Sequence, residues 1–398
     1  LSGAMTLNAD LVLTTQNSSY DYGYPTITIS GVISGTHNIT KAGYGALVLS
    51  GNNTFDGSLT INSGTLTLSG TNTYIGSTII NYGTLTYGID NAISSGAVTV
   101  NGGTLSIAGY SDTVGAVTLI SGTITGTTGV LTGTSYTVER GTISAILGGT
   151  DVTLTKNTVN TVTLSKANTY TGLTTVNAGT LTYGIADAIS SGAVTVNGGT
   201  LSIAGYSDTV GAVTLISGTI TGTTGVLTGT SYTVENGTIS AILGGTDVTL
   251  TKNTAGTVTL SCANTFTGGV TLSAGTLNIN NAQALGTVAG TFIINGGTID
   301  NTSAAAITTN AYPMTWGGDF TFTGTKDLNL GTGATSMSAA RQVTVNGGTF
   351  TVGGIISGAG YRLTKAGAGT LTLSGANTFT GGVTLSAGTL NINAVAAL

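Results

Sequence analysis

The chain repeats a short block of sequence about every nineteen residues. The block Gly-Thr-Leu-Thr at residues 64–67 returns at residues 83–86. Equivalent blocks follow at steps of 19 or 20 residues and begin at Gly45, Gly64, Gly83, Gly103, Gly122, Gly141, Asn160, Gly179, Gly199, Gly218, Gly237, Gly256 and Gly275. A longer period lies above the short one, because residues 92–139 recur unchanged at 188–235, an offset of 96. Such periods are typical of solenoids, in which each repeat packs on its neighbours.

Within each unit, apolar and polar side chains alternate with a period of two. In the Thr-Leu-Thr-Leu of residues 65–68 the leucines point to one side of an extended chain and the threonines to the other. Stacking the units predicts one apolar column at Leu66, Leu85, Leu105, Ile124, Ile143, Val162, Leu181, Leu201, Ile220, Ile239, Val258 and Leu277. A second column is predicted three residues before each block, at Ile61, Ile80, Val100, Leu119, Val138, Val176, Val196, Leu215, Val234 and Leu272. We expect Asn157 and Asn253 to interrupt this second column.

Two columns on separate strands indicate a closed coil with an apolar interior. A unit of nineteen residues holds two or three short strands joined by Gly, Asn and Ser turns, and it is too short for a propeller blade. We therefore predict an all-β fold, a parallel β-helix or β-solenoid with coils of 19–20 residues. Glycine turns such as Asn-Gly-Gly at 101–103 allow a positive φ at tight corners, so valine at Gly102 is expected to strain its corner.

The regularity of the repeat changes along the chain and predicts four segments. We expect irregular coils or a cap over 1–40, and a regular β-helix with the repeated 96-residue module over 41–300. Longer, altered coils are expected over 301–345, followed by regular coils over 346–398. The chain starts at Leu1 with no signal sequence after it, so we expect an internal portion or a processed form of a longer protein.

The composition excludes two classes of partner. Only 6% of the residues are charged and the formal net charge is −5, so no basic stripe is present to neutralise the phosphates of a nucleic acid. Apolar runs such as 304–307 are far shorter than the roughly 20 residues that a membrane span requires, and we expect no membrane span. The hydrophobic fraction of 40% includes many strand-favouring residues, which indicates an ordered chain.

Residues 363–381, with the sequence LTKAGAGTLTLSGANTFTG, resemble the autotransporter-associated β-strand repeat, which is also called the passenger-associated transport repeat. Variants of this stretch stand at 39–57, 154–172 and 250–268, and related stretches cover nearly the whole chain. The resemblance implies a large bacterial exoprotein whose passenger region forms a right-handed parallel β-helix on or outside the cell. It implies extracellular or cell-surface display, and it implies no particular ligand.

The sequence predicts no catalytic residue, no cofactor-binding residue and no metal ligand. Asp56, Asp90, Asp112 and Asp151 fall at different distances from their blocks, so no two are expected to stack into the carboxylate pair of a glycosidase. His37 has no polar partners in sequence and is interpreted as satisfied or solvated. Cys262 stands where equivalent repeats have Lys166 and Gly375, so it is interpreted as an outward-facing residue without a role.

Four lysines share one position of the repeat, namely Lys41, Lys156, Lys252 and Lys365. They are interpreted as solvated turn residues, with binding of an acidic surface glycan as the alternative. Glu139 and Lys156 are expected to lie near each other as an exposed pair. The outward threonines, such as Thr65 and Thr67, are interpreted as strand-favouring surface residues, and an ice-binding ladder is the alternative.

Aromatic residues recur in an Asn-Thr-aromatic motif at Phe55, Tyr74, Tyr170, Phe266 and Phe379, where we expect them to pack at a coil corner. Tyr20, Tyr22 and Tyr24 cluster near the start and are expected to cap the coils or to dock a neighbour.

The end of the chain, residues 394–398, shows no polar cap, so we expect neighbouring β-helix segments or copies of the chain to stack end to end. The function predicted is a non-enzymatic structural or adhesive element of a bacterial surface protein, with host-cell or surface glycans as further candidate partners. One alternative is a filament subunit that assembles head to tail, and another is a polysaccharide-active enzyme.

Overall fold

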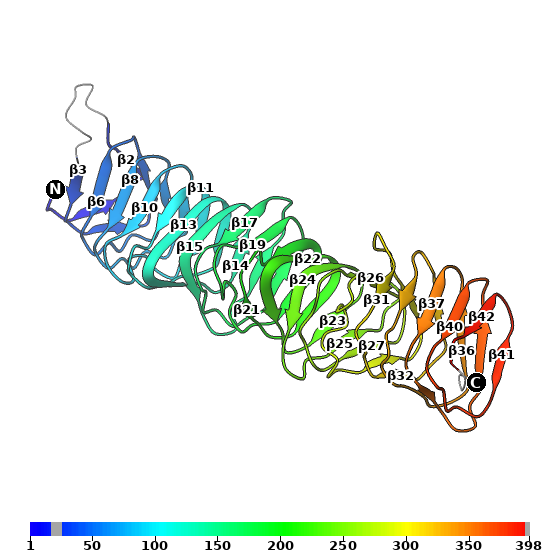
Figure 1. Ribbon diagram of the computed structural model, residues 1–398. Coiled ribbons are helices and arrows are strands. Elements are labelled where there is room, and N and C mark those ends of the chain that lie inside the picture. The colour runs from blue at the N-terminus through cyan, green and yellow to red at the C-terminus, as the bar shows by residue number, and fades with distance from the viewer. Residues whose placement is uncertain (17–25, 395–398) are drawn as a thin grey trace. The chain divides into compact units, whose positions relative to one another are not determined.

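The computed structural model describes residues 1–16 and 26–394, and in that part it contains strands and no helix (Figure 1). The chain divides into two units, Leu1–Ala193 and Val194–Leu398, and each is a stack of coils with its own core. In both units the strands pair in parallel with the preceding and following coil. The predicted all-β parallel solenoid is therefore confirmed. The tyrosine cluster at 20–24 and residues 395–398 of the expected uncapped end lie outside the described residues.

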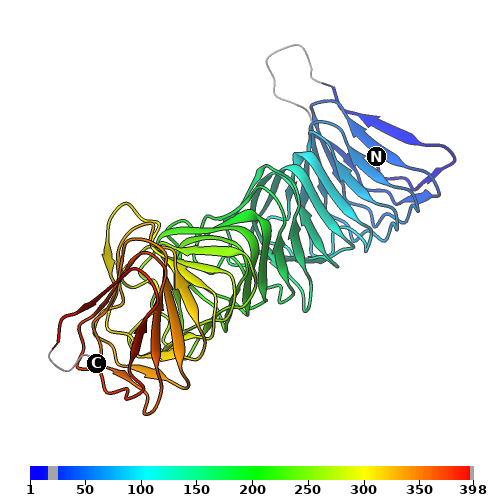
Figure 2. The same cartoon turned by 90° about the vertical axis from the view of Figure 1, so that its right-hand side faces the viewer.

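Unit 1 has two long faces and a third, less regular side (Figure 2). The first face contains β2 (Leu11–Thr14), β5 (Ile39–Ala42), β7 (Leu59–Ile61), β9 (Thr78–Ile80), the starts of β11 (Val98–Ser106) and β13 (Val117–Thr132), β14 (Tyr136–Val138), β16 (Leu154–Lys156) and β18 (Thr174–Val176). The second face contains β3 (Thr26–Ile29), β6 (Ala46–Leu49), β8 (Thr65–Leu68), β10 (Thr84–Tyr87), the continuations of β11 and β13, β15 (Gly141–Gly148), β17 (Thr161–Leu164) and β19 (Thr180–Tyr183). The third side contains β1 (Met5–Leu7), β4 (Ile33–Gly35), β12 (Asp112–Thr113) and the ends of β13 and β15.

The register of the second face confirms the predicted aliphatic column from Leu66 to Ile143. The next predicted step is wrong, because Ile143 pairs with Leu164 and Val162 pairs with Gly141, and the duplicated strands of unit 2 show the same shift. Leu66 pairs with Leu85, and Leu85 pairs with Leu105. All three leucines are fully buried. Each contributes roughly 1.5–3 kcal/mol through burial, and the intervening threonines remain part-exposed on the outer surface. On the first face the second column is likewise buried, from Ile61 to Val176.

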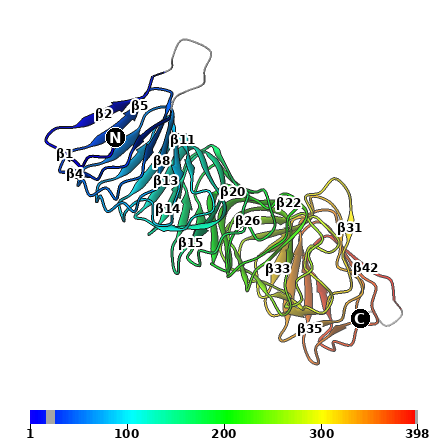
Figure 3. The same cartoon turned by 90° about the vertical axis from the view of Figure 1, so that its left-hand side faces the viewer.

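Unit 2 begins at Val194, inside the second copy of the 96-residue module, and its strands from β20 onward are seen in Figure 3. Its first face contains the starts of β20 (Val194–Ser202) and β22 (Val213–Thr228), β23 (Tyr232–Val234), β25 (Leu250–Lys252), β27 (Val270–Leu272), β29 (Phe292–Ile294), β32 (Met314–Trp316), β35 (Thr335–Met337) and β38 (Ile356–Ser357). Its second face contains the continuations of β20 and β22, β24 (Gly237–Gly244), β26 (Thr257–Leu260), β28 (Thr276–Ile279), β30 (Thr298–Asp300), β33 (Phe320–Phe322), β36 (Arg341–Val345), β39 (Leu363–Ala366) and β41 (Val383–Leu385). Its third side contains β21 (Asp208–Thr209), the ends of β22 and β24, and then β31 (Ile307–Thr308), β34 (Leu328–Asn329), β37 (Thr349–Val352), β40 (Thr370–Leu373) and β42 (Thr389–Ile392).

The late repeats of unit 2 lie one side further around the coil than the early ones. The Leu-Thr-Lys strand at 250–252 belongs to the first face, whereas the equivalent strand at 363–365 belongs to the second face. Between them the coils lengthen, since Phe292 pairs with Met314 and Thr298 pairs with Thr321. Each of these longer coils carries three short strands, and the added residues advance the repeat by one side.

The corners between the first and second faces are tight, and Gly102 shows why glycine is required there. Its φ of +109° lies in the region that residues with a Cβ avoid. A Cβ added at Gly102 would lie 2.7 Å from the carbonyl oxygen of Asn81 on the preceding coil. The expected strain of a valine at this position is consistent with this geometry.

Candidate functional site

The acidic side chains of unit 1 are mostly dispersed, but two of them lie on adjacent coils. Asp90 Oδ1 accepts a hydrogen bond from the backbone N–H of Ser111 at 2.8 Å, and the charge of Asp90 helps to raise the pKa of the neighbouring Asp112. The offsets within the repeat did not predict this proximity. Over residues 1–16 and 26–394, no group of three or more His, Cys, Asp or Glu side chains is arranged to hold a metal ion.

Asp112 lies inside the coil, where a substrate does not reach it. Its side chain is 3% exposed, and burial raises its pKa to about 6. Oδ2 accepts a hydrogen bond from the backbone N–H of Ile93 at 3.0 Å, and this bond lowers the pKa of Asp112. The buried hydroxyl of Tyr87 also lowers this pKa, but the effect of burial is larger. In unit 2, the duplicated Asp208 is equally buried. A raised carboxyl pKa is a common sign of an acid catalyst, but here it results from enclosure in the core.

The remaining reactive side chains have local structural partners. His37 Nδ1 lies 3.1 Å from the carbonyl oxygen of Leu7. Cys262 is part-exposed, and its thiol donates to the carbonyl oxygen of Ser240 at 3.0 Å. Asp151 adopts a φ of +58°, as its duplicate Asp247 does with a φ of +59°, so both occupy left-handed corner positions.

The four repeat lysines are buried, and their interpretation as solvated turn residues is wrong. Lys41, Lys156, Lys252 and Lys365 all have 0% relative exposure. Lys156 aligns with Val138 and Val176, so it stands in the second apolar column. Asn157 and Asn253, which were expected to interrupt that column, point outward and are exposed. The turn that follows Lys156 contains one residue more than the turns after Ile61 and Val176, which is why counting back from the block selected the wrong residue.

Each buried ammonium group binds the backbone oxygens of two adjacent turns. Lys41 Nζ donates to the carbonyl oxygens of Ala42 at 2.9 Å, Gly43 at 2.7 Å and, on the next coil, Ser63 at 3.1 Å. Lys365 repeats this arrangement in unit 2 with Ala366, Gly367 and Ala387. The carbonyl groups therefore satisfy a cation in the core without a carboxylate partner.

The other two lysines use a threonine-containing turn. Lys156 Nζ donates to the carbonyl oxygen of Thr158, to Thr158 Oγ1 at 3.3 Å and to the carbonyl oxygen of Ala178 at 3.2 Å. Thr158 Oγ1 in turn donates to the backbone oxygen of Glu139 at 3.0 Å. Glu139 and Lys156 interact electrostatically, as their expected proximity requires, but the pair is not exposed, because Lys156 is enclosed. The charge of Glu139 raises the pKa of Lys156, and the larger effect of burial lowers it.

The asparagine of each Asn-Thr-aromatic motif also links neighbouring coils through buried hydrogen bonds, a role that the sequence reasoning missed. We call such a buried polar side chain, whether lysine or asparagine, an internal bracket. Asn72 Nδ2 donates to the carbonyl oxygens of Gly70 at 2.8 Å and Ala92 at 2.5 Å, and Asn72 Oδ1 accepts from Asn53 Nδ2 at 2.7 Å. Asn168 and Asn264 make the corresponding bonds to the coils on either side of them. In each motif the asparagine stands two residues before the aromatic residue, and this constant spacing in sequence was the available signal for its role.

The aromatic residues of the same motif pack inside the corner as predicted. Phe55, Tyr74, Tyr170, Phe266 and Phe379 are at most 4% exposed. Phe55 and Tyr74 stack with ring centroids 4.7 Å apart, and the Tyr74 hydroxyl lies 2.7 Å from Thr78 Oγ1.

Above the buried lysines of unit 1 lies an exposed edge, where the first face turns into the second. We call this edge the corner strip, and it comprises residues 43–45, 62–64, 81–83, 101–103, 120–122, 139–141, 157–160 and 177–179. Tyr44 is 76% exposed, Tyr82 is 81% exposed and Val159 is 85% exposed. Lys41 and Lys156 lie directly beneath this strip, because the carbonyl groups that they bind belong to its turns.

Comparison with known proteins connects these repeats to bacterial exoproteins. The passenger-associated transport repeat matches the chain at residues 39–67, 62–86, 88–107, 154–182, 250–279 and 363–392. The adhesin BmaC autotransporter of Brucella suis biovar 1 (strain 1330) is 29% identical to the chain over 202 residues. That alignment covers 50% of this chain and 5% of the Brucella protein. No solved structure matches the chain.

The matched residues include all four buried lysines, together with the turns that the lysines hold. The residues that match the repeat therefore include the buried lysines as well as residues of the apolar columns. These six matched segments resemble the passenger-associated transport repeat, and the structure builds them as coils of a parallel β-solenoid.

Proposed function

We propose that this chain is a non-enzymatic adhesive segment of the passenger region of a large bacterial secreted or surface protein. The observation that carries the proposal is the likeness to the Brucella adhesin over 202 residues, and the six matches of the transport repeat support it. The chain covers only 5% of that protein. The adhesive role is therefore proposed for this segment alone, and the experiment below uses this chain.

The chemistry of the interior supports a structural role for the polar residues. The buried lysines and asparagines bind backbone groups of neighbouring coils. Asp112, whose pKa burial raises, is enclosed beside Tyr87. The groups with unusual chemistry are thus engaged inside the coils, while the corners and outer threonines face the surroundings. In the described part of the chain, no helix is long and apolar enough to cross a membrane.

Adhesion of beads that carry the purified full chain to cultured epithelial cells tests the proposal. We expect the coated beads to bind the cells in greater number than beads coated with an unrelated β-solenoid. Incubation of the chain with polysaccharides, followed by a reducing-sugar assay, tests the enzyme alternative. Binding no greater than that of the control beads, or catalytic release of reducing sugar, would contradict the proposal.

A further inference from the structure

The corner strip carries large exposed side chains that the coil does not need for folding. The two copies of the 96-residue module provide the comparison, because their buried residues are nearly the same. Tyr82, Arg140 and Val159 of the first copy are replaced by Ala178, Asn236 and Ala255 in the second. The turn after Lys252 keeps the same lysine contacts as the turn after Lys156, although valine has become alanine. The bulk at the tips therefore serves something other than the packing of the coil.

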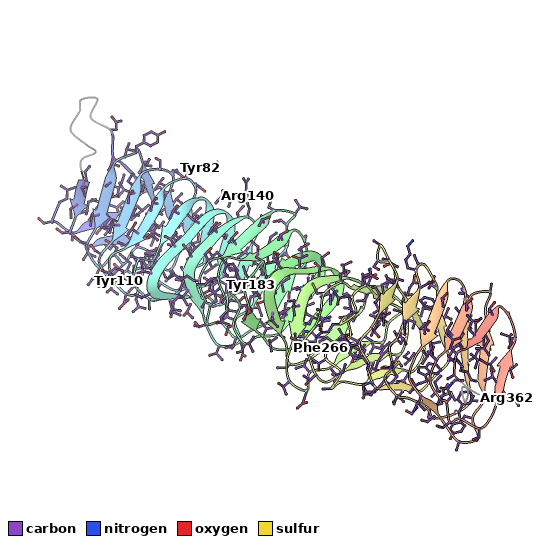
Figure 4. The ribbon with its side chains drawn as sticks, viewed as in Figure 1. Tyr82, Tyr110, Arg140, Tyr183, Phe266 and Arg362 are labelled. Carbon is purple, nitrogen blue, oxygen red and sulfur yellow. The ribbon has the colours of Figure 1, made fainter. Side chains whose placement is uncertain are left out.

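Tyr82 lies beside Gly102 of the next coil, while most of its ring remains open to solvent. A Cβ placed on Gly102 of the next coil would lie 3.3 Å from Tyr82 Cδ1 and Cε1, so the ring rests against that glycine. Figure 4 shows Tyr82 and Arg140 on the same edge, with Tyr110 away from that edge. A tyrosine side chain has only two rotatable bonds before its hydroxyl, so it loses little conformational freedom when a ligand stacks on its ring.

Hydrogen-bonding amides run alongside the tyrosines. Asn81 Nδ2 donates to Asn62 Oδ1 at 2.8 Å, and Asn101 Nδ2 donates to Asn81 Oδ1 at 3.4 Å. Tyr44 and Tyr82 stand two coils apart, which is roughly 10 Å at the usual spacing of paired strands. That separation is close to the length of two sugar rings in an extended polysaccharide.

We propose that the corner strip of unit 1 binds an uncharged, extended glycan. The rings of Tyr44 and Tyr82 stack on the apolar faces of sugar rings, and the side chains of Asn62, Asn81 and Asn101 exchange hydrogen bonds with sugar hydroxyls. This inference rests on the proposed adhesive function and specifies its partner.

The shape of the strip favours a glycan over a protein. Ser63, Gly102 and Ser121 separate the large side chains, so no broad apolar patch forms of the kind that lies at the centre of protein interfaces. The charged residues in these turns are Glu139 and Arg140, whose formal charges cancel. An extended chain of sugars is narrow enough to follow an edge that is one turn wide.

The bead assay, repeated with variants and treated cells, tests this inference. Periodate oxidation, under conditions that cleave the bond between neighbouring ring hydroxyls, opens the sugar rings of surface glycans, and trypsin removes surface proteins. We expect periodate to reduce the adhesion of the unsubstituted chain, and the double variant Tyr44→Ala/Tyr82→Ala to reduce it roughly tenfold. Tyr82→Phe retains the stacking ring and is expected to keep adhesion. Tyr110→Ala, a matched control away from the strip, should also keep it.

The outcomes separate the inference from the function on which it rests. Adhesion that resists periodate but is lost after trypsin would indicate a protein partner and overturn the glycan inference, while the adhesive function would stand. Full adhesion by the double tyrosine variant would also overturn the inference. Absence of adhesion by the unsubstituted chain would overturn the proposed function itself. Circular dichroism of each variant confirms that its coils are intact.

Discussion

Replacing Lys41 by methionine tests whether the buried lysines hold the coils together. Methionine keeps most of the length and the apolar character of the lysine stem but has no hydrogen to donate. The carbonyl groups of Ala42, Gly43 and Ser63 would lose donors that now lie at 2.9, 2.7 and 3.1 Å. Each buried acceptor left without a partner costs about 1–3 kcal/mol.

Removing the ammonium group also has a favourable effect, because burial lowers the pKa of Lys41 and a charge in the core is costly to desolvate. That relief offsets part of the loss, and we expect Lys41→Met to destabilise the surrounding coils by about 2–4 kcal/mol net. In a solenoid the effect remains close to the altered coil, since each repeat contacts only its neighbours.

Hydrogen exchange followed by mass spectrometry measures this effect where it occurs. We expect faster exchange of the backbone amides between residues 39 and 65, with unchanged exchange around Lys365 in the other unit. Lys166→Met is the matched control, because the side chain of Lys166 is part-exposed. If Lys41→Met exchanged as slowly as the unsubstituted chain, the bonds from the lysine would add no net stability, and their bracing role would be refuted.

Three further changes test the corners and the buried polar groups. Because burial raises the pKa of Asp112 from 3.8 to about 6, its folded form binds a proton more tightly than its unfolded form, so stability is lost as pH rises from about 4 to 6. Asp112→Asn should remove that loss and stabilise the fold at pH 7 by about 1–3 kcal/mol, seen as a flatter dependence of melting temperature on pH. Gly102→Val should destabilise by about 2 kcal/mol or more in urea unfolding, because φ is +109°, whereas Gly109→Val, without a positive φ, should cost less. Asn72→Ala leaves buried carbonyl groups unpaired and should lower the free energy of unfolding by about 2–4 kcal/mol. The control Asn52→Ala, at an exposed position, should lower it by under about 1 kcal/mol in the same urea unfolding experiment. Equal losses at both sites would argue against the internal bracket.

The regular coils were predictable because their information is local and repeated. The spacing of Leu66, Leu85 and Leu105 specifies both which side chain is buried and which coil it pairs with. Alternation with a period of two assigns the faces, and a slip by one residue would expose the leucines. The alignment of Leu68 with Tyr87 follows from the same register.

The interior lysines could not be found in this way, because a charged residue in a repeat is ordinarily assigned to the surface. Burial of Lys156 depends on the carbonyl groups of Thr158 and Ala178 pointing inward at the corner. That arrangement is a property of backbone geometry and does not appear in the hydropathy pattern. The available clue was that Lys156 stands between Val138 and Val176 once the turn after it is allowed one more residue.

The shift of the late repeats was also beyond the sequence pattern. Residues 261–280 and 374–393 differ at one position, yet Asn264 lies on the third side of its coil and Asn377 lies on the first face. What moves them is the accumulated length of the intervening coils, in which strands such as β31 contain only two residues. A motif determines its own turn and strand, but its position around the coil depends on everything that precedes it.

The lysine bracket tests this distinction between local and cumulative information within one chain. Lys41 stands on the first face of unit 1, whereas Lys365 stands on the second face of unit 2. Nevertheless, each lysine binds the carbonyl groups one, two and twenty-two residues ahead of it. The bracket therefore belongs to the repeat and its successor, whatever side they occupy. This independence lets the coils lengthen between repeats without loss of the bracket, and it leaves the tips of the turns free to differ, as Tyr82 and Ala178 do.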